Sequence, residues 1–76
     1  MELTGPLPIL LEVVSLGEMP KVYQLLQEHG VTISKQRVEM AENRQMIGYE
    51  LADLLSPELK QQIQTLRQTQ TIYLFA

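Results

Sequence analysis

The chain has 76 residues, a formal net charge of −3 and no cysteine. This length allows a single domain, residues 1–76. The missing cysteine excludes thiol catalysis and cysteine-based metal sites, and it fits a reducing cytoplasm. The acidic balance and the scattered lysines and arginines argue against nucleic acid as a partner, because phosphate binding needs clustered positive charge.

Residues 1–8 are expected to form an irregular lead-in, because glycine and prolines interrupt regular structure there. The short, branched apolar segment Ile9–Ser15 predicts a strand. Pro20 suits the first turn of a helix. The residues that follow recur at helical spacing, and they are Val22, Leu25, Leu26 and His29. Gly30 then favours a left-handed cap at the end of this helix.

A long hairpin is predicted next. Val31–Met40 is a strand whose apolar residues change parity, so one buried face requires a bulge near Lys35–Arg37, or else the strand is two-faced. The polar segment Ala41–Arg44 indicates a loop of roughly four residues. Gln45–Ala52 is the returning strand, and its apolar positions on one side are Ile47, Tyr49 and Leu51.

A second helix and a last strand complete the chain. Ser56-Pro57-Glu58 is typical of a helix start, with serine as the N-cap, proline in the first turn and an acid near the positive end of the dipole. Leu59, Ile63 and Leu66 continue at helical spacing. The β-branched and aromatic segment Thr71–Phe75 predicts the last strand.

The predicted order is therefore β-α-β-β-α-β, which makes the chain an α+β protein. We expect a ferredoxin-like sandwich, in which one four-stranded antiparallel sheet carries both helices on one face. The right-handed crossover rule leaves few alternatives. The uncovered face should be polar, yet both parities of the strands contain apolar residues. The pattern leaves open which face the helices cover.

A partly apolar open face, or a strand edge without a neighbour, usually marks an interface. We therefore predict a homodimer that forms through the sheet edge or through the open sheet face. Another protein or a small ligand is the alternative partner. The predicted interface residues all lie in the second strand, and they are Ile33, Lys35, Arg37, Val38 and Met40.

Catalytic constellations are missing from the sequence, so we expect no enzymatic activity, no cofactor and no metal site. His29 is the only histidine, and its place before Gly30 indicates a contact with the last carbonyls of its helix. Glu12 and Glu50 fall in neighbouring strands, where two acids on one face would suit acid–base chemistry or Mg²⁺. The simpler interpretation is a solvated face whose charges nearby cations offset.

The same order of elements occurs in RNA-recognition domains, and Arg44 followed by Gly48-Tyr49 resembles their third-strand motif. Such domains stack bases on several aromatic side chains of the open face. This chain has too few aromatic residues for that, and its net charge is negative. RNA is therefore not the expected partner.

The turn between the first strand and the first helix is the candidate ligand site. Gly17, Glu18 and Met19 lie at a helix N-terminus, where free backbone N–H groups attract anions or small carboxylates. The charge of Glu18 would repel such ligands. A turn with a purely structural role is the alternative interpretation.

The strand Ile9–Ser15, the turn with Gly17 and Pro20, and the helix that ends in Gly30-Val31-Thr32-Ile33 resemble an ACT domain, a regulatory module that senses small molecules. That family usually has an apolar strand, a turn with Asp-x-Pro-Gly-like residues, and a helix before Gly-Val/Ile-x-Ile. The last element fits well. The turn departs from the pattern, because it lacks the aspartate and the closing glycine, and this puts amino-acid binding there in doubt.

The layout of the whole chain also resembles the cytosolic C-terminal domain of the MgtC/SapB family of bacterial membrane proteins, including the second helix with Leu59, Ile63 and Leu66. This resemblance implies a regulatory or protein-contact domain in the cytoplasm, attached to the inner membrane only through a segment upstream of Met1. The ACT pattern implies the alternative, a dimeric sensor of an amino acid or an anion.

Overall fold

The computed structural model describes residues 7–75, and its elements follow the predicted order. They are β1 (Ile9–Ser15), α1 (Lys21–Glu28), β2 (Ile33–Ala41), β3 (Arg44–Leu51), α2 (Pro57–Leu66) and β4 (Thr71–Phe75). The bounds of β1 and β4 agree with the prediction. Leu7 and Pro8 belong to no strand or helix, as expected, whereas the rest of the predicted lead-in, residues 1–6, lies outside the described residues.

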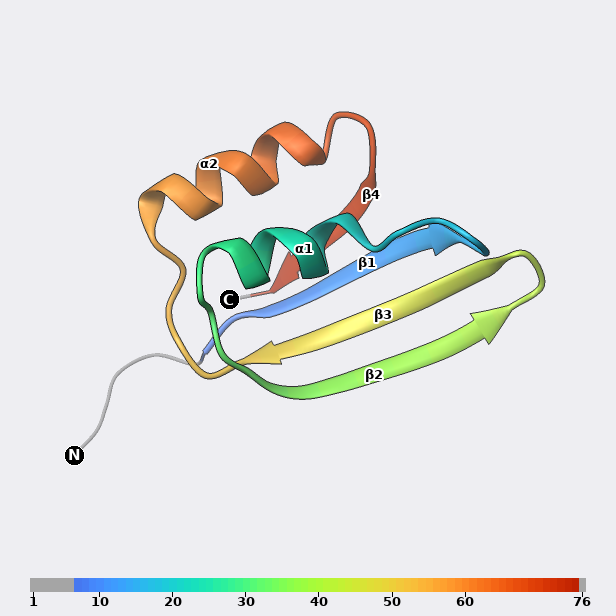
Figure 1. Cartoon of the computed structure of the whole chain (residues 1–76), viewed down its shortest axis with the longest axis horizontal. Helices are drawn as coiled ribbons and strands as arrows, with labels where there is room; N and C mark the ends of the chain where they lie inside the picture. Colours follow the sequence, from blue (N-terminus) through green and yellow to red (C-terminus); the bar gives the residue numbers. More distant parts are fainter. Residues whose placement is uncertain (1–6, 76) are drawn as a thin grey trace.

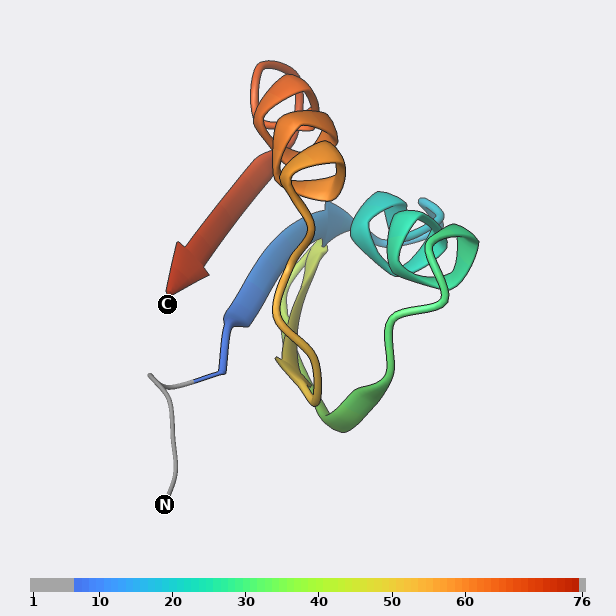
Figure 2. The ribbon, with the colours of Figure 1, turned by 90° about the vertical axis from the view of Figure 1, so that its left-hand side faces the viewer.

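The four strands form one antiparallel sheet in the order β2-β3-β1-β4. Both helices lie on the same side of this sheet (Figure 1). Figure 2 shows the second side of the sheet without a helical layer. The predicted α+β, ferredoxin-like sandwich is therefore confirmed, and β2 and β4 are the two edges of its sheet.

The core lies between the helices and one face of β1, β3 and β4. In β1 the helix-facing set is Leu10, Glu12 and Val14, because strand residues two apart share a face. The other buried apolar side chains are Val22, Leu26, Ile47, Tyr49, Leu51, Leu55, Leu59, Ile63 and Ile72. Burial of each large side chain contributes about 1.5–3 kcal/mol, the main source of stability in a chain without disulfides. The face of the sheet that the helices cover is therefore the one that carries Leu10, Glu12 and Val14 of β1.

The two helices begin in different ways. α2 begins as predicted, because the Ser56 side chain accepts a hydrogen bond from Leu59 N–H at 3.1 Å and Pro57 is the first helical residue. In α1 the N-cap residue is Pro20, which makes no side-chain capping bond. The first turn of α1 therefore needs an acceptor from elsewhere in the fold.

The end of α1 determines where β2 begins. Gly30 has a φ of +67°, which confirms the predicted left-handed cap, and Val31 N–H donates to the Leu26 carbonyl at 3.0 Å. Val31 is therefore part of the helix cap, and β2 begins at Ile33 instead of Val31. The register with β3 shifts between Ile33 and Lys35, so the predicted bulge exists, just before the expected range.

The hairpin between β2 and β3 is tighter than predicted. Ala41 and Arg44 are paired strand residues, so Glu42 and Asn43 alone form the turn. Glu42 adopts a φ of +51°, the left-handed conformation that tight turns require and that most residues avoid. The expected loop of roughly four residues is therefore wrong, because extending the ladder by one more pair satisfies the backbone groups of Ala41 and Arg44.

Candidate functional site

Glu12 and Glu50 lie on opposite faces of the sheet, so the hypothesis of a paired acid site is wrong. In the register of β1 with β3, Glu12 lies beside Ile47, and Ile9 lies beside Glu50. Ile9 and Glu12 are three positions apart, which puts their side chains on different faces. Glu12 faces the helices and is 2% exposed. The alternative of a solvated face is therefore also wrong for this residue.

The buried Glu12 carboxylate supplies the missing cap of α1. It accepts hydrogen bonds from Val22 N–H at 3.1 Å and from Tyr23 N–H at 3.3 Å, and the hydroxyl of Tyr49 donates to it as well. The two N–H groups belong to the first helical turn, which has no intrahelical acceptors for them. A carboxylate is also favoured at the positive end of the helix dipole.

Burial, and then the hydrogen bond to Glu12, raise the pKa of the Tyr49 hydroxyl far above its usual value. Tyr49 therefore remains a donor to the carboxylate, and the three donors hold Glu12 in a structural role. A carboxylate that is enclosed in this way has no route to a substrate. The arrangement explains how an ionisable residue is accommodated between a strand and a helix.

Sequence reasoning missed the role of Glu12, although the sequence contains a signal for it. Glu12 stands between Leu10 and Val14 in an otherwise apolar set of alternating positions. The helix that follows has Pro20 in the capping position, where no side-chain oxygen is present. An acid among apolar strand positions, followed by a helix without its own cap, indicates a long-range cap.

His29 joins the two helices. Its Nε2 lies 2.9 Å from Oε1 of Gln62 in α2, and the ring is half-buried. The predicted contact of this ring with the last carbonyls of its own helix is replaced by this bond between helices. The role remains structural, as we expected.

The candidate ligand turn is held together by hydrogen bonds between its own residues. Glu18 Oε1 accepts a hydrogen bond from Ser15 N–H at 3.1 Å, and Glu18 N–H donates to the Ser15 carbonyl at 3.1 Å. Gly17 supplies a φ of +89°, which this turn needs. Met19 is 61% exposed. Of the three predicted ligand residues, only Glu18 borders the concave region on the open face.

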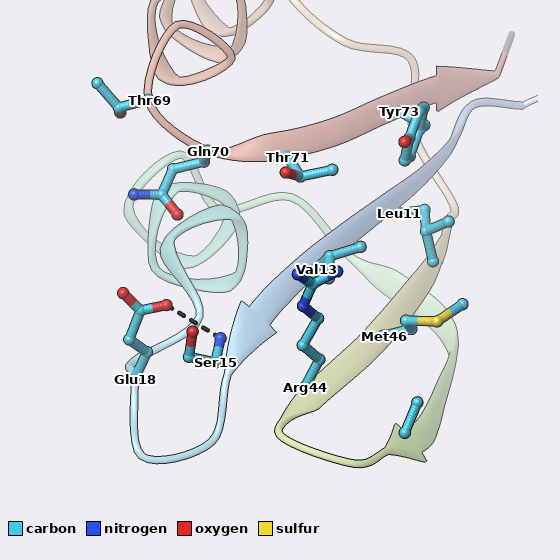
Figure 3. A pocket seen from close by; sticks show the side chains of 11 residues that line it. Leu11, Val13, Ser15, Glu18, Arg44, Met46, Thr69, Gln70, Thr71 and Tyr73 are labelled. Carbon is cyan, nitrogen blue, oxygen red and sulfur yellow. Dashed lines mark hydrogen bonds between the residues drawn. The ribbon is translucent and has the colours of Figure 1, made fainter.

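That concave region is a groove of about 600 Å³ on the side of the sheet that the helices leave open. Its floor is lined by apolar side chains (Leu11, Val13, Met46 and Tyr73) and by polar ones (Ser15, Thr69, Gln70 and Thr71). Glu18 lies at one end of the groove beside Ser15 (Figure 3), and Arg44 is the second charged residue of the lining. The Arg44 side chain extends along the floor near Val13 in this view. The groove therefore has a mixed apolar and polar lining with one acid and one guanidinium group.

The five predicted interface residues lie on both sides of β2. The register puts Val38 beside Ile47 and Arg37 beside Gly48, so Val38 and Met40 are on the helix-facing side with Ile33, while Lys35 and Arg37 are on the open side. Ile33 packs against the core. Val38 and Met40 are 51% and 62% exposed, because the helices do not cover this edge strand (Figure 1).

Within residues 7–75, no group of three or more histidine, aspartate or glutamate side chains is placed to hold a metal ion. Neither helix in the same range has the length and apolar character that a membrane span requires.

No protein-family model matches the chain, and no curated protein matches its sequence. A solved structure does match, the ligand-free regulatory subunit of aspartate kinase from Thermus thermophilus, with a TM-score of 0.53 and 16% identity. The fold is ACT-like. The match covers 99% of this chain and 57% of that subunit, so the chain spans little more than half of its neighbour's length.

Proposed function

We propose that this chain is a non-catalytic regulatory module that acts by contact with another protein surface, and that a second copy of the chain is its first partner. The uncovered side of the sheet carries this proposal. Ile9, Tyr73 and Phe75 on that side are 42%, 48% and 55% exposed. Leu11 and Val13 continue the same face along β1, and Met46 lies beside Val13 in β3. A contiguous apolar surface of this kind on a small domain favours an interaction site.

The β2 edge adds a second surface to the same proposal. Every residue of β2 after Ile33 is exposed, and the strand has a neighbour on only one side. An exposed edge offers unpaired backbone groups that accept another strand. The face and the edge adjoin, so both serve one contact function.

Within this proposal, the chain corresponds to the cytosolic domain of an MgtC/SapB-type bacterial membrane protein. The support for this finer assignment is the shared layout of strand, capped helix, long hairpin and second helix. The ACT-like fold agrees with a regulatory role. A domain of this type would act in the cytoplasm and reach the membrane only through another segment of its protein.

Light scattering at several protein concentrations tests the proposal. The 8.7 kDa chain should approach twice that mass as its concentration rises, because association buries the uncovered apolar side. A mass that stays at that of one chain up to millimolar concentration would contradict association with a second copy.

A small-ligand sensor is the second candidate, and the groove on the open face favours it. Glu18 and Arg44 have opposite charges and border a groove with both apolar and polar side chains, an arrangement that suits a small zwitterion or a carboxylate with an apolar part. A thermal-shift screen over amino acids, nucleotides and divalent ions separates the candidates, because a ligand raises stability in proportion to the logarithm of its concentration over Kd. A specific shift that Arg44→Ala removes supports the sensor, and a flat screen favours the contact module.

A further inference from the structure

We propose that the open side of the sheet binds an amphipathic α-helix of another protein, with the apolar side of that helix on β1 and β4 and an acidic flank toward Arg37 and Arg44. This inference rests on the proposed contact function, and it assigns the open face to a partner other than a second copy. It follows from three properties of that face: its division into an apolar and a charged half, its excess of cations, and a hollow at Gly48.

The open side of the sheet is divided along its strands. On this side β1 and β4 carry mostly apolar side chains, whereas β2 and most of β3 carry charged ones. The apolar half consists of Ile9, Leu11, Val13, Tyr73 and Phe75 with Met46 beside them, and the charged half contains Lys35, Arg37, Glu39, Arg44 and Glu50. Neighbouring strands lie about 4.8 Å apart, so the apolar half is about 10 Å wide, which is the width of one α-helix.

A helix fits this apolar half better than a second sheet does. A sheet packed face to face would cover all four strands and would remove the charged side chains of β2 and β3 from water, which destabilises the contact unless each charge finds a partner. A helix that lies along β1 covers the apolar half and leaves the charged half at its flank. β1 has seven residues, a length of roughly 20 Å, which about 14 helical residues span.

The open side of the strands differs in charge from the rest of the chain. It carries three of the six basic residues and two of the nine acidic ones, and these are Lys35, Arg37, Arg44, Glu39 and Glu50. Its net charge is therefore +1, which leaves −4 for all other residues. Glu18 adjoins this side from its turn, but its carboxylate already accepts a hydrogen bond from Ser15 N–H. An acidic flank on the partner helix complements the two guanidinium groups.

Gly48 leaves a hollow in the middle of the open side. It lies between Arg37 of β2 and Leu11 of β1, and the register is regular on both sides of it. Neither its φ nor lack of space requires a glycine, because an added Cβ would meet only Leu11 Cδ1, at an ordinary 3.8 Å. A glycine inside a strand weakens it and often marks a place where another molecule approaches closely. The hollow therefore offers a site for one bulky apolar side chain of the helix.

Two synthetic peptides test the charge and the shape of the partner. The first is an amphipathic helix of about 14 residues, with leucines at i, i+3, i+4 and i+7 spacing, one central phenylalanine, and glutamates along one flank. In the second peptide, lysines replace the glutamates. Fluorescence anisotropy of the labelled peptides should show saturable binding of the glutamate peptide, and the lysine peptide should bind at least about tenfold more weakly.

Gly48→Val tests the hollow. The branched side chain suits a strand and meets no close neighbour, so the melting temperature should stay the same or rise. The substitution should weaken binding of the glutamate peptide at least about tenfold, because the helix can no longer approach the sheet. Gly48→Ala adds one methyl group and should have an intermediate effect. A loss of binding in an equally stable protein separates the hollow from a structural role.

Arg37→Glu tests the charged flank. It should weaken binding of the glutamate peptide and strengthen binding of the lysine peptide, each by about threefold. Lys60→Glu is the matched control, because it changes the net charge by the same amount at an exposed position of α2, on the other side of the sheet. It should leave both Kd values within about twofold, since solvent and salt screen a charge at that distance.

The outcomes separate this inference from the proposed function. Unchanged binding by Gly48→Val, or tighter binding of the lysine peptide to the unmodified chain, would overturn the helix as described. Binding to vesicles of phosphatidylcholine and phosphatidylserine, with no binding of either peptide, would overturn it in favour of anionic lipid. A dimer by light scattering that binds neither peptide would overturn the helix and leave the second copy standing. A single-chain mass together with binding of the glutamate peptide would remove the second copy and support this inference.

Discussion

The two helices satisfy the free N–H groups of their first turns with residues at different distances along the chain. The first turn of any helix has N–H groups without intrahelical acceptors. In α2 the acceptor is Ser56, directly before the helix. In α1 it is Glu12, ten positions before Val22 and in a different element. The start of α2 is encoded locally, whereas the start of α1 exists only when β1 is in place.

This difference makes α1 depend more than α2 on the rest of the fold. It has eight residues, and isolated helices shorter than about 12 residues are marginal in water. Its first turn bonds to a buried carboxylate that is also bonded by Tyr49 of β3. The Glu12 cluster, defined here as Glu12, Tyr49 and the N–H groups of Val22 and Tyr23, therefore links two strands and one helix. Changes to it should affect the whole fold.

The largest effect is expected for Glu12→Ala. This substitution leaves two helix N–H groups and a buried hydroxyl without acceptors, and we expect it to lower the free energy of unfolding by about 3 kcal/mol. Urea denaturation followed by circular dichroism measures the change. Glu28→Ala, at the exposed end of the same helix, is the control and should change stability by less than about 0.5 kcal/mol. Equal effects of the two substitutions would refute the long-range cap.

A smaller loss is expected for Tyr49→Phe, which keeps the buried ring and removes one donor to the carboxylate. Hydrogen bonds to charged groups contribute about 1.5–3 kcal/mol, and we expect a loss near the lower end, since Glu12 keeps its two backbone donors. Tyr73→Phe is the matched control, because Tyr73 is 48% exposed and should tolerate the change. Denaturation curves of the two variants that coincide would show that the Tyr49 hydroxyl contributes nothing.

Ser56→Ala removes the cap of α2 and so measures how much the second helix depends on it. Loss of a serine N-cap costs about 1 kcal/mol, and the effect should remain local to the start of α2. The exposed Ser15, at the end of β1, provides Ser15→Ala as a control without a helix cap. A loss at Ser56 as large as that at Glu12 would mean that the two helix starts depend on their caps equally.

The smallest effect on stability at neutral pH is expected from the ionisation of the Tyr49 hydroxyl, and this effect increases at basic pH. Its pKa is raised above the ordinary value of 10.0, so the folded chain holds this proton where the unfolded chain releases it. The stabilisation is complete below about pH 10 and decreases as pH rises further, with a slope of at most about 1.4 kcal/mol per pH unit. Tyr49→Phe should lose stability less steeply above pH 10 in the same titration. Identical slopes would contradict the raised pKa.

The parts of the fold that could be predicted are those whose sequence signals lie within a few neighbouring residues. Ser56-Pro57 fixes the start of α2, Gly30 fixes the end of α1, and short branched segments fix β1 and β4. The covered face of the sheet could not be predicted, because β1 has apolar residues at both parities. The orientation of Glu12 follows from that face, so the only signal for the Glu12 cluster was an acid among apolar strand positions, followed by a helix without a side-chain cap of its own.

For the predicted interface residues, the sequence placed all five in the second strand but could not say on which face each side chain lies. The sides taken by Val38 and Met40 depend on the bulge after Ile33, and one position of shift exchanges the two faces. The exposed state of Val38 depends on how far the helices extend over the sheet, which is a property of packing. The groove at Glu18 and Arg44 likewise joins residues from separate elements.

Association with a second copy is the central claim, and amide hydrogen exchange at several protein concentrations tests directly whether the β2 edge takes part in it. Ala41 and Arg44 close a two-residue turn as a hydrogen-bonded pair, and such pairs alternate along the ladder. The amides of Lys35, Arg37 and Glu39 therefore point to β3 and should be protected at every concentration. The amides of Gln36, Val38 and Met40 point outward, so they should exchange fast in dilute solution and slow down as the mass doubles. Outward amides that exchange equally fast in the single chain and in the dimer would contradict a contact through the β2 edge.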